Sequence, residues 1–121
     1  MILRPRPGHP FTAGSPLFFA HRGGAKLAPE NTLEAFRSAV DLWGADVLEM
    51  DAHCTRDGEL VVIHDATVDR TTDGEGAVKD LLLSELQDLD AGFRFRDLNG
   101  EASFRGLGVR IPLFRDVLEA L

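Results

Sequence analysis

The chain has 121 residues, of which 44% are hydrophobic, and it carries a formal net charge of −7 at pH 7. A nucleic-acid surface needs a basic patch, so this charge speaks against nucleic-acid partners. No apolar stretch reaches the ~18–20 residues that span a membrane. The only cysteine, Cys54, excludes a disulfide within these residues and suits a reducing compartment, so we expect a cytoplasmic protein.

The first fifteen residues predict a loose leader. Met1–Gly14 contains Arg4 and Arg6, but proline and glycine follow them instead of an apolar run. A secretory signal peptide needs such an apolar run, so this segment does not resemble one.

The first predicted strand, Leu17–Ala20, ends directly at His21, Arg22 and two glycines. A guanidinium suits phosphate, a histidine exchanges a proton near neutral pH, and glycine lets a ligand approach closely. This cluster indicates a ligand site, with a polar turn as the alternative.

A helix is predicted to begin at Asn31, because Asn31 and Glu34 have the spacing of a capping box. It is expected to end at Gly44. The apolar residues at helical spacing, which we expect to be buried, are Leu33, Phe36, Val40 and Trp43. Trp43 is therefore expected in the core and not at a ligand site.

The next apolar run, Ala45–Leu48, leads into two acids, Glu49 and Asp51. Alternate residues of a strand share a face, so the two carboxylates are expected side by side. They would repel each other unless a cation or a proton lay between them. A hard cation that prefers carboxylate oxygens, Mg²⁺ or Ca²⁺, fits there, with a solvated sheet edge as the alternative.

A hairpin is predicted around Asp57-Gly58, which lie between two strand-like runs. A two-residue turn at these positions would put Asp51 directly opposite His64, on the face shared with Glu49. A histidine beside a carboxylate pair is better explained as a catalytic acid or base than as a core residue.

The second half of the chain predicts less regular structure. Thr67–Gly76 is interpreted as a solvated loop, since it lacks the spacing of an EF-hand calcium loop. A short amphipathic helix is expected to begin near Ser84, and a last helix over Phe114–Leu121. Between them, Gly92–Gly108 is predicted to be a loop, whose phenylalanines either anchor this segment or line a substrate entrance.

Five motifs follow one another in order: Ala20–Gly24 (AHRGG), Pro29–Phe36 (PENTLEAF), Leu48–Asp51 (LEMD), Thr55–Gly58 (TRDG) and Val62–Asp65 (VIHD). Together they resemble the N-terminal part of the glycerophosphodiester phosphodiesterase family, from about Leu17 to Thr72 and more weakly through Ile111-Pro112. The resemblance implies an α/β fold, the N-terminal portion of a TIM-type (β/α)8 barrel with a small inserted subdomain. Residues 16–121 would form a partial domain, with the insertion at approximately 67–110.

The resemblance also implies roles for individual residues. His21 and His64 match the catalytic acid/base pair. Arg22 matches the residue that binds the substrate phosphate. Glu49 and Asp51 match two ligands of a divalent metal ion, Mg²⁺ or Ca²⁺.

The implied reaction is the metal-dependent hydrolysis of a small-molecule glycerophosphodiester to sn-glycerol 3-phosphate and an alcohol. In the family, a third acidic ligand follows a helix like Phe114–Leu121, so we expect it beyond Leu121. A complete barrel typically needs about 250 residues, so we expect a truncated chain, inactive by itself. The alternatives are a non-catalytic fragment that binds phosphate or metal, and a related phospholipase D-like or sphingomyelin-cleaving phosphodiesterase. The head group and the oligomeric state stay open.

Overall fold

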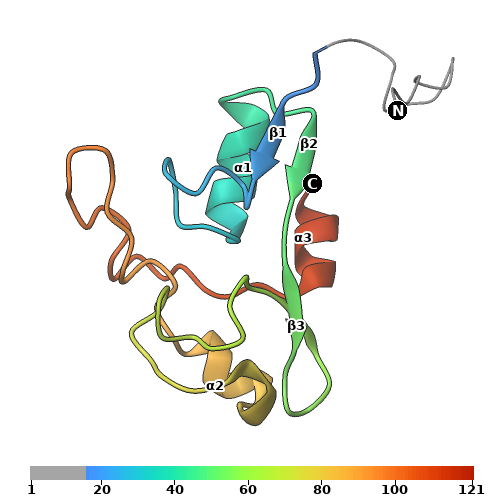
Figure 1. The fold of residues 1–121 in the computed structure, drawn as a ribbon, viewed down its shortest axis with the longest axis vertical. Helices are drawn as coiled ribbons and strands as arrows, with labels where there is room; N and C mark the ends of the chain where they lie inside the picture. The colour runs from blue at the N-terminus through green and yellow to red at the C-terminus, as the bar shows by residue number, and fades with distance from the viewer. Residues whose placement is uncertain (1–15) are drawn as a thin grey trace, which may run out of the picture.

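The structure is a computed structural model that describes residues 16–121; the predicted leader lies outside these residues. The elements in chain order are β1 (Phe19–His21), α1 (Leu33–Asp41), β2 (Val47–Glu49), β3 (Ala52–Cys54), β4 (Leu60–Val62), the 3-10 helix η2 (Val78–Asp80), α2 (Leu83–Gln87) and α3 (Phe114–Ala120). Figure 1 shows β1, β2 and α1 in its upper part and α2, with the loops around it, in its lower part.

The upper part is a βαβ unit. Strands β1 and β2 pair in parallel, with Phe19 opposite Val47 and His21 opposite Glu49, and α1 lies in the connection between them (Figure 1). Parallel strands joined through a helix are the repeating unit of a TIM-type barrel. The pairing brings the carboxyl ends of both strands, and with them His21 and Glu49, to the same edge.

The hairpin of β3 and β4 has a different register from the predicted one. Ala52 lies opposite Val62 and Cys54 opposite Leu60. The Ile63 amide donates to the Asp51 carbonyl at 2.9 Å, so Asp51 lies opposite Ile63. The prediction that Asp51 faces His64 across the hairpin is wrong.

The turn explains this shift of one residue. The loop has three residues, numbers 56–58, because the Thr55 amide donates to the Glu59 carbonyl at 2.9 Å. Gly58 has φ of 80°, as in a turn closed by a left-handed residue. The Asp57 carboxylate accepts from Thr55 Oγ1 at 2.6 Å and from the Leu83 amide at 3.0 Å, which fixes Asp57 in the loop.

Helix α1 begins two residues later than predicted. Its N-cap is Thr32, whose Oγ1 accepts from the Ala35 amide at 3.2 Å. Asn31 has φ of 57°, which is incompatible with the extended backbone of an N-cap residue. The predicted cap at Asn31 is therefore wrong, and the Asn31 side chain bonds Asp51 instead.

The buried face of α1 is also narrower than predicted. Its buried residues are Ala35, Phe36 and Ala39, whereas Trp43 is 54% exposed. The helix ends at Asp41, with Leu42 as its C-cap, so Trp43 and Gly44 lie beyond its last turn and the apolar stripe does not extend to them. The expectation that Val40 and Trp43 are buried is wrong, since Val40 is 39% exposed as well. Gly44 has φ of 63°, and the Ala45 amide donates to the Ala39 carbonyl at 2.9 Å, so a left-handed glycine closes the helix end as predicted.

Two hydrophobic clusters hold the described residues together. Phe36 of α1, Val62 of β4 and Val117 of α3 form the smaller one, which joins these three elements. The larger cluster is formed mainly by side chains of residues 67–110, packed against β4 and the segment before α3. Its members include Val61, Val68, Val78, Leu86, Val109 and Ile111.

Within residues 67–110, the loop predicted to be solvated has buried anchors. Val68 and Thr72 are completely buried, and Thr72 Oγ1 donates to the Val68 carbonyl at 2.8 Å. Phe104 packs against the larger cluster and contacts Phe95 edge to face, with ring centroids 5.4 Å apart. Its contacts match the predicted anchoring role.

The short helix α2 and the last helix α3 form where the sequence predicts them, with α3 ending one residue before Leu121. No helix among residues 16–121 is long and apolar enough to cross a membrane.

Candidate active site

The ends of β1 and β2 bring the first two polar clusters together. His21 Nε2 lies 3.8 Å from Glu49 Oε2, and the Arg22 amide donates to the same oxygen at 3.1 Å. The side chain of His21 is 71% exposed, so it is open to a ligand. The parallel pairing that the βαβ unit imposes is what creates this contact.

Arg22 lies among carboxylates. Its Nη1 donates to Glu30 Oε1 at 3.3 Å, and its Nε lies 3.7 Å from Asp51 Oδ2. That Nε is buried and makes no hydrogen bond within residues 16–121. A buried donor without a hydrogen-bond partner costs free energy. The ion pairs of Arg22 with Glu30 and Asp51, and the bond from its backbone amide to Glu49, hold the side chain in this position despite that cost.

The backbone at Arg22 is unusual, and the adjacent glycine explains how it fits. Arg22 has φ of 52°, a region that non-glycine residues seldom adopt outside functional sites. At Gly23, with φ of 76°, a Cβ atom would lie 2.8 Å from Phe36 Cδ1. Gly23 therefore lets the loop approach α1, in addition to any role in ligand approach.

Asn31 fixes the second carboxylate. Its Nδ2 donates to Asp51 Oδ2 at 3.1 Å, while its Oδ1 accepts from the Asp51 amide at 3.4 Å. The Asn31 amide also donates to the Arg22 carbonyl at 2.9 Å. Asn31 is 3% exposed and thus ties the loop after β1 to the residues after β2.

A chain of charged side chains runs from Arg22 to His64. Arg70 donates to Glu30 twice, from Nη1 at 3.0 Å and from Nη2 at 2.6 Å. It also donates to Asp65 twice, from Nε at 2.8 Å and from Nη2 at 3.0 Å. Asp65 Oδ1 in turn lies 2.7 Å from His64 Nδ1. We call these five residues the charged chain.

The contacts of the charged chain keep its acids ionised. The hydrogen bonds from Arg70, and then from His64, hold the pKa of Asp65 well below its usual range. Burial raises the pKa of Glu30, but the hydrogen bonds and charge of Arg70 and the charge of Arg22 outweigh it, so that the pKa is lowered. The hydrogen bonds to Glu30 and Asp65 raise the pKa of Arg70.

Within residues 16–121, His64 is connected to the residues at the ends of β1 and β2 through the charged chain. Among the described residues, His64 makes no ion pair with Glu49 or Asp51. Its carbonyl accepts a hydrogen bond from His53 Nε2 at 2.9 Å, which adds a second histidine beside it. The structure thus gathers His21, Arg22, Glu49 and Asp51 directly and connects His64 to them through Asp65, Arg70 and Glu30.

Two carboxylates suit a divalent cation at the strand ends. Within residues 16–121, Glu49 and Asp51 each accept hydrogen bonds through one oxygen only, Oε2 and Oδ2. Their other oxygens have no hydrogen-bond partner in this part of the chain. No group of three or more His, Cys, Asp and Glu that could hold a metal ion occurs among the described residues.

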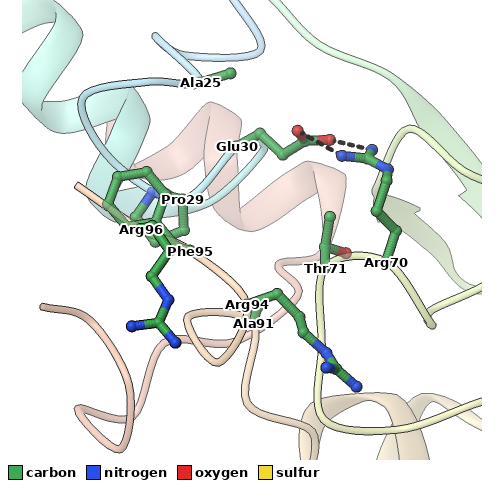
Figure 2. Close-up of a pocket in the computed structure, with 9 residues that line it drawn as sticks. All are labelled: Ala25, Pro29, Glu30, Arg70, Thr71, Ala91, Arg94, Phe95 and Arg96. Atoms are coloured by element: carbon green, nitrogen blue, oxygen red, sulfur yellow. Dashed lines mark hydrogen bonds and ion pairs between the residues drawn. The ribbon is translucent and has the colours of Figure 1, made fainter. Parts of the chain in front are cut away.

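A cavity of about 210 Å³ borders the charged chain. Figure 2 shows the paired Glu30 and Arg70 on one side of it and Pro29 and Phe95 on the other. A second cavity, of about 330 Å³, lies along β1 and is lined by His21 and by three aromatic residues, Phe18, Phe19 and Trp43. His21 therefore borders the cavity along β1, and Glu30 and Arg70 of the charged chain border the first cavity.

Sequence reasoning missed five residues of this site: Glu30, Asn31, His53, Asp65 and Arg70. Glu30, Asn31 and Asp65 lie inside the recognised motifs, so their polarity next to expected strand and helix ends was an available signal. Arg70 gives no such signal, because its partner Glu30 is 40 residues away.

The fold and the site define a class of protein. A βαβ unit with histidine, arginine and acids at the carboxyl ends of its strands is the N-terminal portion of a TIM-type barrel whose polar site lies at that face.

The comparison with families then identifies the chain. The sequence model of the family described as "Glycerophosphoryl diester phosphodiesterase family" matches residues 21–121, and the chain belongs to this family. This confirms the resemblance of the five motifs.

Individual relatives agree with the family. The chain is 52% identical over 105 residues to a glycerophosphodiester phosphodiesterase of Caldanaerobacter subterraneus subsp. tengcongensis, covering 87% of this chain and 40% of that protein. The glycerophosphodiester phosphodiesterase structure from Agrobacterium tumefaciens matches with a TM-score of 0.75 and 42% identity, covering 85% of this chain and 41% of that one.

A third relative was solved with a bound product. An Oleispira antarctica phosphodiesterase in complex with the product sn-glycerol-3-phosphate matches with a TM-score of 0.71 and 33% identity, covering 87% of this chain and 39% of that one. The chain thus spans about two-fifths of the length of the relatives it matches.

Proposed function

We propose that this chain contributes the two histidines, the arginine and two metal ligands of a site that hydrolyses glycerophosphodiesters to sn-glycerol 3-phosphate and an alcohol. The observation that carries the proposal is the contact of His21 and Arg22 with Glu49 at the ends of paired strands, in a chain of this family. The product bound to the Oleispira antarctica relative supports the same class of substrate.

Glu49 and Asp51 are the residues that would hold a divalent ion, Mg²⁺ or Ca²⁺. Each keeps one carboxylate oxygen without a partner among residues 16–121, and such oxygens are the ligands these cations prefer. A divalent ion supplies positive charge that stabilises the charge developing on a phosphate under attack. We expect a third acidic ligand beyond Leu121.

Arg22 binds the phosphate by charge and by hydrogen bonds in this proposal. Its side chain is only 19% exposed, and its guanidinium is held by Glu30 and Asp51. A guanidinium fixed in this way loses little conformational freedom when it meets an anion.

The two histidines divide the proton transfers. One takes a proton from the attacking group, either water or a neighbouring glycerol hydroxyl, as its oxygen bonds to phosphorus, and the other gives a proton to the alkoxide that leaves. Where the glycerol hydroxyl attacks, water then opens the cyclic phosphate to give sn-glycerol 3-phosphate. Such acid and base assistance typically contributes roughly 10²–10⁴ in rate. His21 and His64 are both exposed enough to reach a substrate, with side chains 71% and 42% exposed.

A chimera tests the proposal. In it, the 105-residue stretch of this chain that matches the Caldanaerobacter enzyme replaces its counterpart there. We expect the chimera to release glycerol phosphate from glycerophosphoethanolamine and the isolated 121-residue chain to release almost none. A folded chimera that binds glycerol phosphate without hydrolysing any diester would favour the non-catalytic alternative. Cleavage of lysophospholipid or sphingomyelin alone would favour the lipid-cleaving alternative.

A further inference from the structure

The side chain of His64 is held on one side only. Its Nδ1 lies 2.7 Å from Asp65 Oδ1, and no hydrogen bond of its Nε2 occurs within residues 16–121. An ionised carboxylate can only accept, so Nδ1 carries the proton in this hydrogen bond. The neutral ring is then the Nδ1–H tautomer, and Nε2 keeps the lone pair that can take a proton.

Asp65 is itself held in place by Arg70. The guanidinium makes two hydrogen bonds to Asp65, at 2.8 and 3.0 Å, and two to Glu30, at 3.0 and 2.6 Å. A planar guanidinium that is bidentate to two carboxylates fixes both of them in distance and in direction. Asp65 cannot rotate away from His64 without losing both bonds to Arg70.

Arg70 has a fixed backbone. It lies between Val68 and Thr72, which are both completely buried. The Val68 amide donates to the Gly76 carbonyl at 3.0 Å, and the Thr72 amide to the Val68 carbonyl at 3.1 Å. The loop therefore presents the guanidinium from a packed support.

We propose that Asp65 and Arg70 are positioning residues for His64: Asp65 selects the Nδ1–H tautomer, which leaves Nε2 to exchange the proton with substrate, and Arg70 fixes Asp65 against Glu30. This inference rests on the proposed function for the role of His64. The choice of tautomer does not rest on it, because the tautomer is a property of the chain without substrate.

The tautomer is measured directly by nitrogen NMR of the imidazoles in the 121-residue chain at pH 8, with the His64 signals assigned by His64→Gln. We expect His64 to be mainly Nδ1–H in the unaltered chain. Asp65→Ala removes the acceptor and should return His64 to the ordinary majority of Nε2–H. Arg70→Gln leaves the acceptor but frees it to rotate, so an intermediate ratio is expected.

The matched control is Asp116→Ala, which removes the acid of the exposed Arg115–Asp116 pair, 3.9 Å apart. It should leave the His64 tautomer unchanged. A His64 that is mainly Nε2–H in the unaltered chain, or that keeps its tautomer in Asp65→Ala, would overturn the inference.

Kinetics of the chimera provide the second readout. Asp65→Ala should lower kcat by roughly 10²-fold, the lower end of what proton transfer contributes, with KM changed little. An equal loss through KM would show that Asp65 acts on substrate binding and would contradict the positioning role. Activity that survives His64→Ala would instead contradict the proposed function, whatever the tautomer.

Discussion

The surroundings of the two histidines differ. His21 extends from the end of β1 with its side chain 71% exposed, and its Nε2 lies 3.8 Å from Glu49 Oε2. His64 follows β4 and is bound at 2.7 Å to Asp65, which Arg70 holds in turn. The orientation of His64 is thus set by this part of the chain. No comparable short bond orients the ring of His21 among residues 16–121.

The comparison extends to the acids around each histidine. On the His21 side, Glu49 and Asp51 each keep one carboxylate oxygen that accepts no hydrogen bond from residues 16–121. On the His64 side, Asp65 and Glu30 already share the charge of Arg70. In the proposed function the first side would take a metal ion and phosphate, and the second holds a histidine in a fixed direction.

The largest effect is expected from removing either histidine. In the chimera, His21→Ala and His64→Ala should each lower kcat by roughly 10²–10⁴-fold, because each carries one proton transfer. The rate of glycerol phosphate release measures this, with Asp116→Ala as the matched surface control. If only one histidine mattered, the two sides would not form one site.

Metal binding tests the His21 side next. Because two carboxylates are a small share of the 6–8 oxygens that Ca²⁺ takes, calorimetry should give a Kd of roughly 10⁻³ M or weaker for the 121-residue chain. Glu49→Ala and Asp51→Ala should each abolish that binding. The control is Asp69→Ala in the loop considered as a calcium site. If Asp69→Ala abolished the binding and Glu49→Ala did not, the ligands would lie in that loop.

Asn31 tests how the Asp51 side chain is held. Asn31→Ala should lower the free energy of unfolding by about 2–3 kcal/mol, because it removes two hydrogen bonds and forces alanine into a left-handed backbone. Asn31→Gly removes the same bonds without the backbone strain, so it should cost about 1 kcal/mol less. Urea unfolding measures both, and equal losses would show that the backbone at Asn31 is unstrained.

A smaller effect is expected at the helix that follows. Thr32→Ala removes the cap of α1 and should cost about 1 kcal/mol of unfolding free energy, whereas Thr32→Ser keeps the hydroxyl and should cost less. The same urea experiment measures it. A loss as large in Thr32→Ser would assign the effect to packing of the buried methyl group.

The smallest effect concerns acid stability on the His64 side. The folded-state pKa values of Asp65 and Glu30 are lowered, so their contribution is present above their unfolded values, about 4, and is lost as pH falls through the folded ones. Because Arg70 is half-exposed, the contribution is about 0.5–1 kcal/mol. Between pH 5 and 2, Arg70→Gln should therefore lose less stability than the unaltered chain. Arg115→Gln is the control and should follow the unaltered chain.

The strand-end clusters could be predicted from sequence because each polar residue directly follows an apolar run. The βαβ pairing then brings His21 to Glu49 without further information. The hairpin register was predicted wrongly, because Asp57-Gly58 is compatible with a two-residue turn and with the three-residue loop that forms. The bond from the Leu83 amide that holds Asp57 in this loop comes from 26 residues away, so the local sequence does not contain it.

The same limit applies to α1 and to the charged chain. Asn31 has a good capping side chain, but its bonds to Asp51 require a backbone that cannot cap. Arg70 meets Glu30 only because residues 67–110 fold back on the ends of the strands. Local sequence patterns predict neither the Asn31–Asp51 nor the Arg70–Glu30 contact, because the partners are 20 and 40 residues apart.

The proposed function requires the phosphate to bind at Arg22, between the two histidines. A crystal structure of the chimera soaked with sn-glycerol 3-phosphate tests it most directly. We expect phosphate oxygens within hydrogen-bond distance of the Arg22 guanidinium, with the imidazoles of His21 and His64 on either side of the phosphate. A product bound only in the cavity between Glu30 and Phe95, with Arg22 still paired to Glu30 and Asp51, would contradict this binding mode.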